Sequence, residues 1–242
     1  MKKIFRFIMK IVFLIVLIAG CFAAINIYEG YNMYKKVTNK VSIEQKVNEI
    51  KNDKNYLKED DIPKLFEDAI ISVEDRRFYK HGAIDVISIG RALITDIKNK
   101  SLIEGGSTIT QQLAKNMYLS REKKLSRKVA EVFIAFDLEK RYSKKEIIGL
   151  YINIIYFGEG NYGLNEASQG YFKKEPSKLS LYELTLLAGI PNAPSAYALN
   201  KNNELAWERQ DLVIDAMSKN NLISNADIES IRKEQKIKQK SK

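Results

Sequence analysis

The sequence has very little cysteine and histidine: one of each, Cys21 and His81, among 242 residues. With so few, no His/Cys zinc cluster, disulfide framework or four-cysteine iron–sulfur site can form within one chain. A Ser-His-Asp site would have to use His81. Acid–base chemistry therefore falls mainly to carboxylates, because Asp and Glu are the next commonest general acids and bases after His.

Several sequence motifs are also missing. There is no Gly-Lys-Ser/Thr phosphate loop, no Rossmann Gly-x-Gly-x-x-Gly, and no Asp-x-Asp of the kind that binds metal and diphosphate in nucleotide-sugar transferases. Ser120 and Lys123 have Ser-x-x-Lys spacing, but the Ser-Asp-Asn and Lys-Thr-Gly partners of a penicillin-binding site are absent. We therefore treat that match as chance.

The net charge of +10 is concentrated at the two ends of the chain. Residues 1–10 carry four bases and no acid, and residues 232–242 carry six bases and one acid, which leaves residues 11–231 with a net charge of +1. A basic protein of this kind would ordinarily suggest a nucleic-acid partner. Because the charge belongs to the termini, we expect no nucleic-acid binding.

Residues 11–28 form an uncharged run of 18 residues. As a helix this run would be about 27 Å long, close to the bilayer hydrocarbon core of about 30 Å. A buried core helix would normally show a polar stripe, but only Asn26 is polar here. We expect a single-pass cell-membrane anchor with residues 1–10 cytoplasmic and the rest of the chain outside, by the positive-inside rule. The alternative is a lipoprotein signal, because residues 17–21 resemble a processing box that ends in Cys21.

The remainder is predicted to be all-α, because helix-start signals dominate and no apolar/polar alternation of the strand type persists. Asp61 before Pro63 predicts one helix start, and capping-box spacing occurs at Ser143 with Glu146, Ser180 with Glu183, and Ser224 with Asp227. We expect a juxtamembrane stalk or hairpin at 29–57, a folded domain at 58–222, and a basic helix or frayed tail at 223–242.

Three segments carry residues suited to chemistry, and the first is the predicted helix that ends at Glu74. A carboxylate at a helix C-terminus is disfavoured by about 0.3–1 kcal/mol, because it meets the negative end of the helix dipole. The position indicates either a functional carboxylate or a surface glutamate paired with Arg77.

The second segment is a glycine pair at 105–106 followed by Ser107, which predicts a tight turn capped into a helix whose first N–H groups favour an anionic ligand. Gln111 and Lys115 lie one turn apart on that helix, with Gln112 beside them, which suits hydrogen bonding to sugar or phosphate. A glycine turn before a helix is, however, often only a turn.

The third segment is residues 121–128, with a net charge of +4, running into a strongly apolar helix that contains Glu131. A carboxylate in such a helix must be paired or face a cleft. Arg127 and Glu131 have i,i+4 spacing, which braces a surface helix but indicates a site when the pair is buried.

Together, residues 74–82 (EDRRFYKHG), 105–116 (GGSTITQQLAKN), 127–131 (RKVAE), 150–168 and 179–197 resemble the five ordered motifs of family 51 glycosyltransferases, the peptidoglycan polymerases. The resemblance implies a lysozyme-like helical domain with a small membrane-proximal jaw. Since no transpeptidase domain follows, the chain resembles a monofunctional biosynthetic peptidoglycan transglycosylase, related to the glycosyltransferase domain of class A penicillin-binding proteins.

The resemblance also implies a reaction: lipid II is polymerised into β-1,4 glycan with release of undecaprenyl diphosphate. Glu74 would be the general base on the acceptor hydroxyl. Glu131 would assist departure of the pyrophosphate, either directly or through a divalent cation, Mg²⁺ or Mn²⁺. No organic cofactor is implied. The residues implied to neutralise the pyrophosphate are Arg91, Lys115, Lys123 and Arg127. Those implied to line the cleft are Arg77, Phe78, Ser107, Gln111 and Gln112.

The implied partners are the lipid-linked glycan, the membrane, and other cell-wall synthesis and division proteins, with moenomycin as an inhibitor. Two positions depart from the family pattern: Ala83 replaces a usual glycine, and Lys123 stands where arginine is common. The rival hypotheses are a lysozyme-like lytic enzyme and an inactive lipid II-binding scaffold. The basic segment favours synthesis, because cleavage needs no pyrophosphate site, and the two intact glutamates argue against a scaffold.

Overall fold

The computed structural model describes residues 2–99, 105–119, 124–200 and 203–240. Within these ranges it is all-α, as predicted, with no strand and one isolated antiparallel bridge between Tyr156 and Tyr162. The helices are α1 (Lys2–Lys40), α2 (Ile43–Lys51), α3 (Lys64–Glu74), α4 (Val86–Asn99), α5 (Ile109–Tyr118), α6 (Leu125–Arg141), α7 (Lys144–Ile154), α8 (Gly163–Phe172), α9 (Leu181–Gly189), α10 (Pro194–Tyr197), α11 (Asn203–Lys219) and α12 (Asn225–Lys240). Single 3₁₀ turns lie at Phe78–Lys80, Pro176–Lys178 and Ile190–Asn192.

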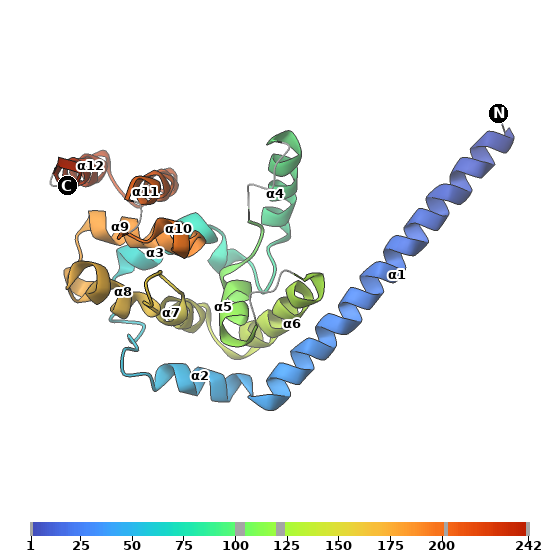
Figure 1. Ribbon diagram of the computed structural model, residues 1–242, viewed down its shortest axis with the longest axis horizontal. Helices are drawn as coiled ribbons and strands as arrows, with labels where there is room; N and C mark the ends of the chain where they lie inside the picture. The colour runs from blue at the N-terminus through green and yellow to red at the C-terminus, as the bar shows by residue number, and fades with distance from the viewer. Residues whose placement is uncertain (1, 100–104, 120–123, 201–202, 241–242) are drawn as a thin grey trace.

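The core lies among α3, α5, α7, α9 and α11, which pack against one another in the body of the molecule (Figure 1). Helix α9 is buried around most of its circumference, which fits its almost wholly apolar sequence. Phe66 and Ile70 of α3, Leu113 of α5, and Leu150 of α7 are fully buried side chains at this centre. Helices α3 and α5 are therefore fixed by the core, and both carry predicted site residues.

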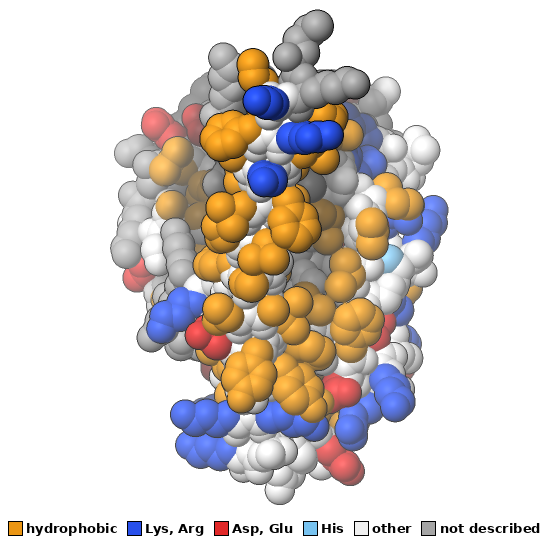
Figure 2. Space-filling model, turned by 90° about the vertical axis from the view of Figure 1, so that its right-hand side faces the viewer, with side chains coloured by type: hydrophobic (Ala, Val, Ile, Leu, Met, Phe, Trp, Pro, Cys, Tyr) orange, Lys and Arg blue, Asp and Glu red, His pale blue; other side chains and the backbone are white. Residues whose placement is uncertain are grey.

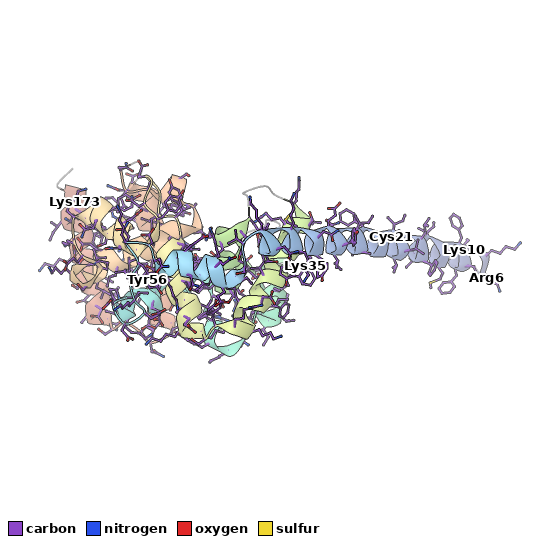
Figure 3. All side chains as sticks on the ribbon, turned by 90° about the horizontal axis from the view of Figure 1, so that it is seen from below. Arg6, Lys10, Cys21, Lys35, Tyr56 and Lys173 are labelled. Carbon is purple, nitrogen blue, oxygen red and sulfur yellow. The ribbon has the colours of Figure 1, made fainter. Side chains whose placement is uncertain are left out.

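Helix α1 is the longest element, and its 39 residues span about 58 Å. Its N-terminal part extends away from the rest of the molecule (Figure 1), and its most apolar window has none of its surface buried. Arg6, Lys10 and Cys21 all project from this free part, whereas Lys35 lies where α1 runs beside the domain (Figure 3). The helix is long and apolar enough to cross a membrane.

Residues 29–57, expected to form a juxtamembrane stalk or hairpin, contribute helices that pack on the domain. The C-terminal part of α1 lies against α6, and α2 packs on α7. Ile43 and Val47 of α2 are buried, because their i,i+4 spacing puts both on the inner face of one helix. The anchor and the domain are thus joined by packed structure.

The three capping predictions at Ser143, Ser180 and Ser224 are confirmed, and the helix start predicted near Pro63 is confirmed without Asp61 as its cap. Ser143 and Ser180 form capping boxes with Glu146 and Glu183, and Ser224 exchanges hydrogen bonds with Asp227. Asp61 caps nothing: its N–H closes a turn onto the carbonyl of Lys58, and α3 begins at Lys64 without a side-chain cap. The basic tail is helical, and α12 packs on α9 with Ile231 buried.

Candidate active site

Glu74 is the last residue of α3 and is held by side chains from two other helices. Its Oε2 accepts a hydrogen bond from Nε2 of Gln112 on α5 at 3.0 Å. Its Oε1 accepts one from Nη2 of Arg209 on α11 at 3.1 Å, and both side chains of this ion pair are largely buried. These donors offset the unfavourable helix dipole, so the carboxylate stands fixed at the end of the helix.

Tyr151 of α7 extends this arrangement. Its hydroxyl donates to Oε1 of Gln112 at 2.9 Å, which orients the amide so that its nitrogen faces Glu74. Burial raises the pKa of Tyr151 well above its ordinary value, and the nearby Glu74 charge adds to this effect. The phenol therefore stays protonated and acts as a donor throughout the physiological range.

Glu131 is 1% exposed on α6 and lies among cations. Its Oε1 accepts from Nη1 of Arg127, and its Oε2 accepts from Nζ of Lys128 at 2.7 Å. Lys128 also donates to Oγ of Ser107 at 2.6 Å, so it connects α6 to the loop before α5. The charge of Glu131 is fully compensated, as a buried carboxylate requires.

Lys115 lies on α5, one turn beyond Gln112 and on the same face. Burial lowers the pKa of Lys115, and Arg127 and Lys128 lower it further, while Glu131 and Glu74 oppose the shift. An ammonium this deeply placed, within the electrostatic reach of both carboxylates, is costly without an anion nearby. The pair of glutamates and the lysine thus form one electrostatic unit.

A cleft of about 740 Å³ opens beside these residues. One part of it is lined by Gln112 and Lys115 of α5, Arg127 of α6 and Tyr151 of α7, and another by Pro191, Asn192, Pro194 and Ser195. Glu74 and Glu131 lie directly behind this wall, in contact with Gln112 and Arg127 respectively. The cleft is large enough for a sugar-sized ligand. Lys115 and Arg127 make one part of its wall basic, which favours an anionic group there, whereas Glu49, Asp53 and Glu166 line the remainder.

The N-terminus of α5 differs in detail from the prediction. Thr108 is the N-cap instead of Ser107, and it forms a capping box with Gln111. Gln111 is therefore buried and committed to the backbone of Thr108, while its neighbour Gln112 faces the cleft. Because Thr108 is the N-cap, Gln111 stands at the third helical position and its side chain closes the capping box, which leaves Gln112 as the glutamine beside Lys115 in the cleft wall.

The other predicted residues are scattered. Phe78 is fully buried in the core beneath the ammonium of Lys144, so it supports the loop and does not line the cleft. Arg77 donates to Asp85 at 3.0 Å, and Arg91 donates to Ser88 on its own helix, α4, at 3.2 Å. Lys123 lies outside the described residues.

Asp75 connects the motif at residues 74–82 with the motif at residues 105–116. One carboxylate oxygen contacts Nε2 of His81 at 2.7 Å, and the other accepts from the backbone N–H of Ile109, the first residue of α5, at 3.0 Å. Asp75, His81 and Asp85 could together offer ligands to a metal, since their ligand atoms lie within 4.8 Å of one another. Each is already hydrogen bonded within the protein, so the cluster acts as a brace for α5.

The implied divalent cation does not fit the environment of Glu131. Both of its oxygens are bound by Arg127 and Lys128, and Lys115 lies nearby. A hard cation prefers several oxygen ligands, whereas this position offers one carboxylate surrounded by positive charge. No step of the chemistry below is therefore assigned to a metal.

Three site residues were missed from the sequence: Arg209, Lys128 and Tyr151. Lys128 stands three residues before Glu131, so the i,i+3 spacing carried a signal for that contact. Tyr151 lies inside one of the five motifs but in an apolar stretch that reads as core. Arg209 contacts a residue 135 positions earlier, and no local pattern predicts such a pair.

Comparison with known proteins agrees with this geometry. The transglycosylase family model matches residues 39–218. Penicillin-binding protein 1F of Bacillus subtilis (strain 168) is 46% identical over 164 residues, covering 68% of this chain and 23% of its own length. Penicillin-binding protein 1A of Vibrio cholerae is 43% identical over 178 residues, covering 74% of this chain and 22% of its own length.

Among solved structures, penicillin-binding protein 1A from Haemophilus influenzae has 22% sequence identity and a TM-score of 0.44, covering 73% of this chain and 17% of its own. The chain spans roughly a quarter or less of the length of the curated relatives it matches. The family model covers most of the chain, including the Glu74, Lys115 and Glu131 segments. The chain therefore belongs to the transglycosylase family.

Proposed function

We propose that the chain is a membrane-anchored peptidoglycan glycosyltransferase that polymerises lipid II and releases undecaprenyl diphosphate. The observation that carries the proposal is a pair of glutamates that both act electrostatically on Lys115: the largely buried Glu74, hydrogen bonded by Gln112 and Arg209, and the buried Glu131, hydrogen bonded by Arg127 and Lys128. One carboxylate is suited to accepting a proton, and the other lies in a basic cluster suited to a pyrophosphate.

In the proposed reaction, the 4-hydroxyl oxygen of the acceptor sugar forms a bond to the anomeric carbon of the donor. The bond from that carbon to the pyrophosphate oxygen breaks, and the hydroxyl proton passes to Glu74. Negative charge develops on the leaving pyrophosphate, where Lys115, Arg127 and Lys128 stabilise it. Glu131 holds these cations in place by its two hydrogen bonds.

The proposed reaction also requires the enzyme to be attached to a membrane. Both substrates are lipid-linked, so the enzyme must meet them at a bilayer surface. Helix α1 supplies a candidate span, with Lys3, Arg6 and Lys10 at the end that the positive-inside rule assigns to the cytoplasm. The catalytic domain then lies on the outer face.

The test is incubation of the purified full chain with labelled lipid II, comparing wild type with Glu131→Gln. Wild type is expected to form glycan that lysozyme digests, and Glu131→Gln is expected to lose at least about a hundredfold in rate, because the cations lose their anchor. An exposed base on the same helix gives the matched control, Lys140→Gln, which should keep its rate. Shortening of preformed glycan without polymer synthesis would instead identify a lytic enzyme.

A further inference from the structure

A further cavity, of about 380 Å³, lies at the corner where α1 meets α2, and we call it the corner groove. Its lining consists of Lys40, Val41, Gln45, Asn48, Glu49 and Asn52. Glu49 also lines the cleft of the candidate active site. The corner groove and the cleft therefore adjoin at this side chain.

Helix α2 forms a wall of both spaces. The side chains that face the cleft are Lys46, Glu49, Ile50 and Asp53, and those that face the corner groove are Gln45, Asn48, Glu49 and Asn52. Residues three and four apart share a face of a helix, so α2 turns one face to the cleft and the neighbouring face to the groove. A chain-like ligand can pass from one space to the other across Glu49.

The corner is held in place by hydrogen bonds on both sides of the bend. Ser42 and Gln45 form the capping box that begins α2. The hydroxyl of Tyr118 on α5 donates to the carbonyl oxygen of Val41 at 3.0 Å. The opposite face of α2 packs on α7. The corner groove is therefore preformed, and α5 fixes its position relative to the cleft.

The side chains of the corner groove suit a neutral ligand rich in hydroxyl and amide groups. Asn48 and Asn52 are exposed one turn apart, and their side-chain amides make no hydrogen bond within the part of the chain that the structure describes. Each amide offers two donor hydrogens and one acceptor oxygen. Lys40 and Glu49 contribute one charge of each sign, so the lining has no net formal charge. N-acetylated sugars present the matching groups, whereas a phosphate would find no net attraction here.

The corner groove lies at the opposite end of α1 from the candidate membrane span. Figure 1 shows α2 leaving the C-terminal end of α1, far from the N-terminus of the chain. Figure 2 shows hydrophobic side chains along α1 and basic and uncharged polar ones at the lower end of the molecule, where this corner is. A cleft of about 740 Å³ encloses a ligand of drug size, so a polymer held there by its lipid-linked end must continue outside it.

From these observations we infer that the corner groove binds the part of the glycan strand that extends beyond the cleft, a β-1,4 chain of N-acetylated sugars. Asn48 and Asn52 are about 6 Å apart along the axis of α2, close to the length of one sugar ring, so they contact successive sugars. The described lining contains no aromatic ring, and hydrogen bonds that exchange with water are weak. Weak contacts let the strand slide as it lengthens while its end stays beside Lys115.

The first test measures binding of a soluble probe, the β-1,4 hexamer of N-acetylglucosamine, to the full chain in detergent micelles. The side-chain NH₂ signals of Asn48 and Asn52 in ¹H–¹⁵N NMR spectra are assigned by their loss in Asn48→Ala and Asn52→Ala. Both signals are expected to shift saturably with the hexamer, and the NH₂ signal of Asn225, exposed on α12, is expected not to shift. Unshifted Asn48 and Asn52 signals at millimolar hexamer would overturn the inference.

The second test measures glycan length, and it depends on the proposed function because it needs a polymerising enzyme. Wild type and Asn48→Ala/Asn52→Ala polymerise labelled lipid II, and their products are compared on gels at equal consumption of lipid II. The double variant is expected to give glycan about threefold shorter or less, because the strand dissociates sooner without the two amides. The matched control is Asn225→Ala/Gln239→Ala, which removes two exposed amides from α12 and should give glycan of wild-type length.

Fluorescence of the single tryptophan, Trp207, reports whether each variant is folded. Glycan of wild-type length from folded Asn48→Ala/Asn52→Ala would overturn the inference and leave the proposed function intact. Failure of the proposed function has a different signature: wild type would form no polymer from lipid II, while the hexamer would still shift the Asn48 and Asn52 signals.

Discussion

Arg209 on α11 donates a hydrogen bond from Nη2 to the Glu74 carboxylate on α3 at 3.1 Å, across 135 residues of sequence. The guanidinium is 13% exposed and the carboxylate 9%, so solvent screens this pair only weakly. The contact leaves the second oxygen of Glu74 to Gln112 and fixes the direction in which the carboxylate can accept a proton.

Replacement of Arg209 by Gln should lower kcat on lipid II by about tenfold to a hundredfold, with KM little changed, because the base loses the donor that orients it. Arg209→Lys should restore part of the rate, since an ammonium keeps the charge but not the planar geometry. Steady-state kinetics measure both. The control is Arg232→Gln, which breaks the more exposed ion pair with Asp211 and should leave kcat unchanged. If Arg232→Gln lowers kcat as much as Arg209→Gln does, a general loss of stability, and not the contact with Glu74, explains the lower kcat of Arg209→Gln.

Lys115 provides a pH test. Burial lowers its pKa below the ordinary value for lysine of about 10.4. As pH rises through the lowered pKa the ammonium loses its charge, so binding of a pyrophosphate donor should weaken at a lower pH than for an ordinary lysine. Lys115→Arg keeps the charge, and the alkaline limb of its kcat/KM profile should move to higher pH.

The control for this profile is Lys140→Arg. Lys140 is exposed on α6, so this variant carries the same Lys-to-Arg substitution at a position away from the cleft. Its alkaline limb should coincide with that of wild type. If Lys115→Arg gives the wild-type limb as well, Lys115 does not carry the charge that binds the donor.

Asp75 should matter for stability. Asp75→Ala removes the acceptor of the Ile109 N–H and the partner of His81, both in a buried setting. A buried donor left unsatisfied costs about 1–3 kcal/mol, which lowers Tm by about 2–4 °C per kcal/mol for a protein of this size. Calorimetry or thermal circular dichroism measures the shift.

Asp60→Ala serves as the comparison, since Asp60 forms an exposed pair with Lys145. Its removal should leave Tm nearly unchanged, because solvent and salt screen an exposed ion pair. Equal Tm values for the two variants would show that the Asp75 bridge does not hold α5 in place.

Much of the fold follows from local sequence patterns. The long apolar run, the capping boxes at Ser143 and Ser180, and the end of α3 at Glu74 all depend on residues a few positions apart, and the structure contains each of them. The packing of residues 43–51 on the domain was not predicted, because Val47 and Ile43 lie on a short polar helix whose partner, α7, is a hundred residues away.

The contacts of the candidate site also fall into two kinds: those that local spacing predicts and those that depend on the packing of distant helices. Glu131 with Arg127 was predictable, because i,i+4 spacing on one helix determines the contact. Arg209 and Glu74 meet only because α3 and α11 pack together in the core. The identity of the N-cap decides what Gln111 does: with Thr108 as the cap, the Gln111 side chain bonds the backbone of the cap and is buried, and Gln112 faces the cleft.

The central claim is that Glu74 is the base of a polymerising reaction. The most direct measurement is the initial rate of polymer formation from labelled lipid II by wild type, Glu74→Gln and Asp68→Asn, the last a carboxylate on the same helix paired with Lys64. We predict polymer from wild type and Asp68→Asn, and a loss of about a hundredfold or more in Glu74→Gln, within the range for a general base. Polymer formation by folded Glu74→Gln at the wild-type rate would contradict it.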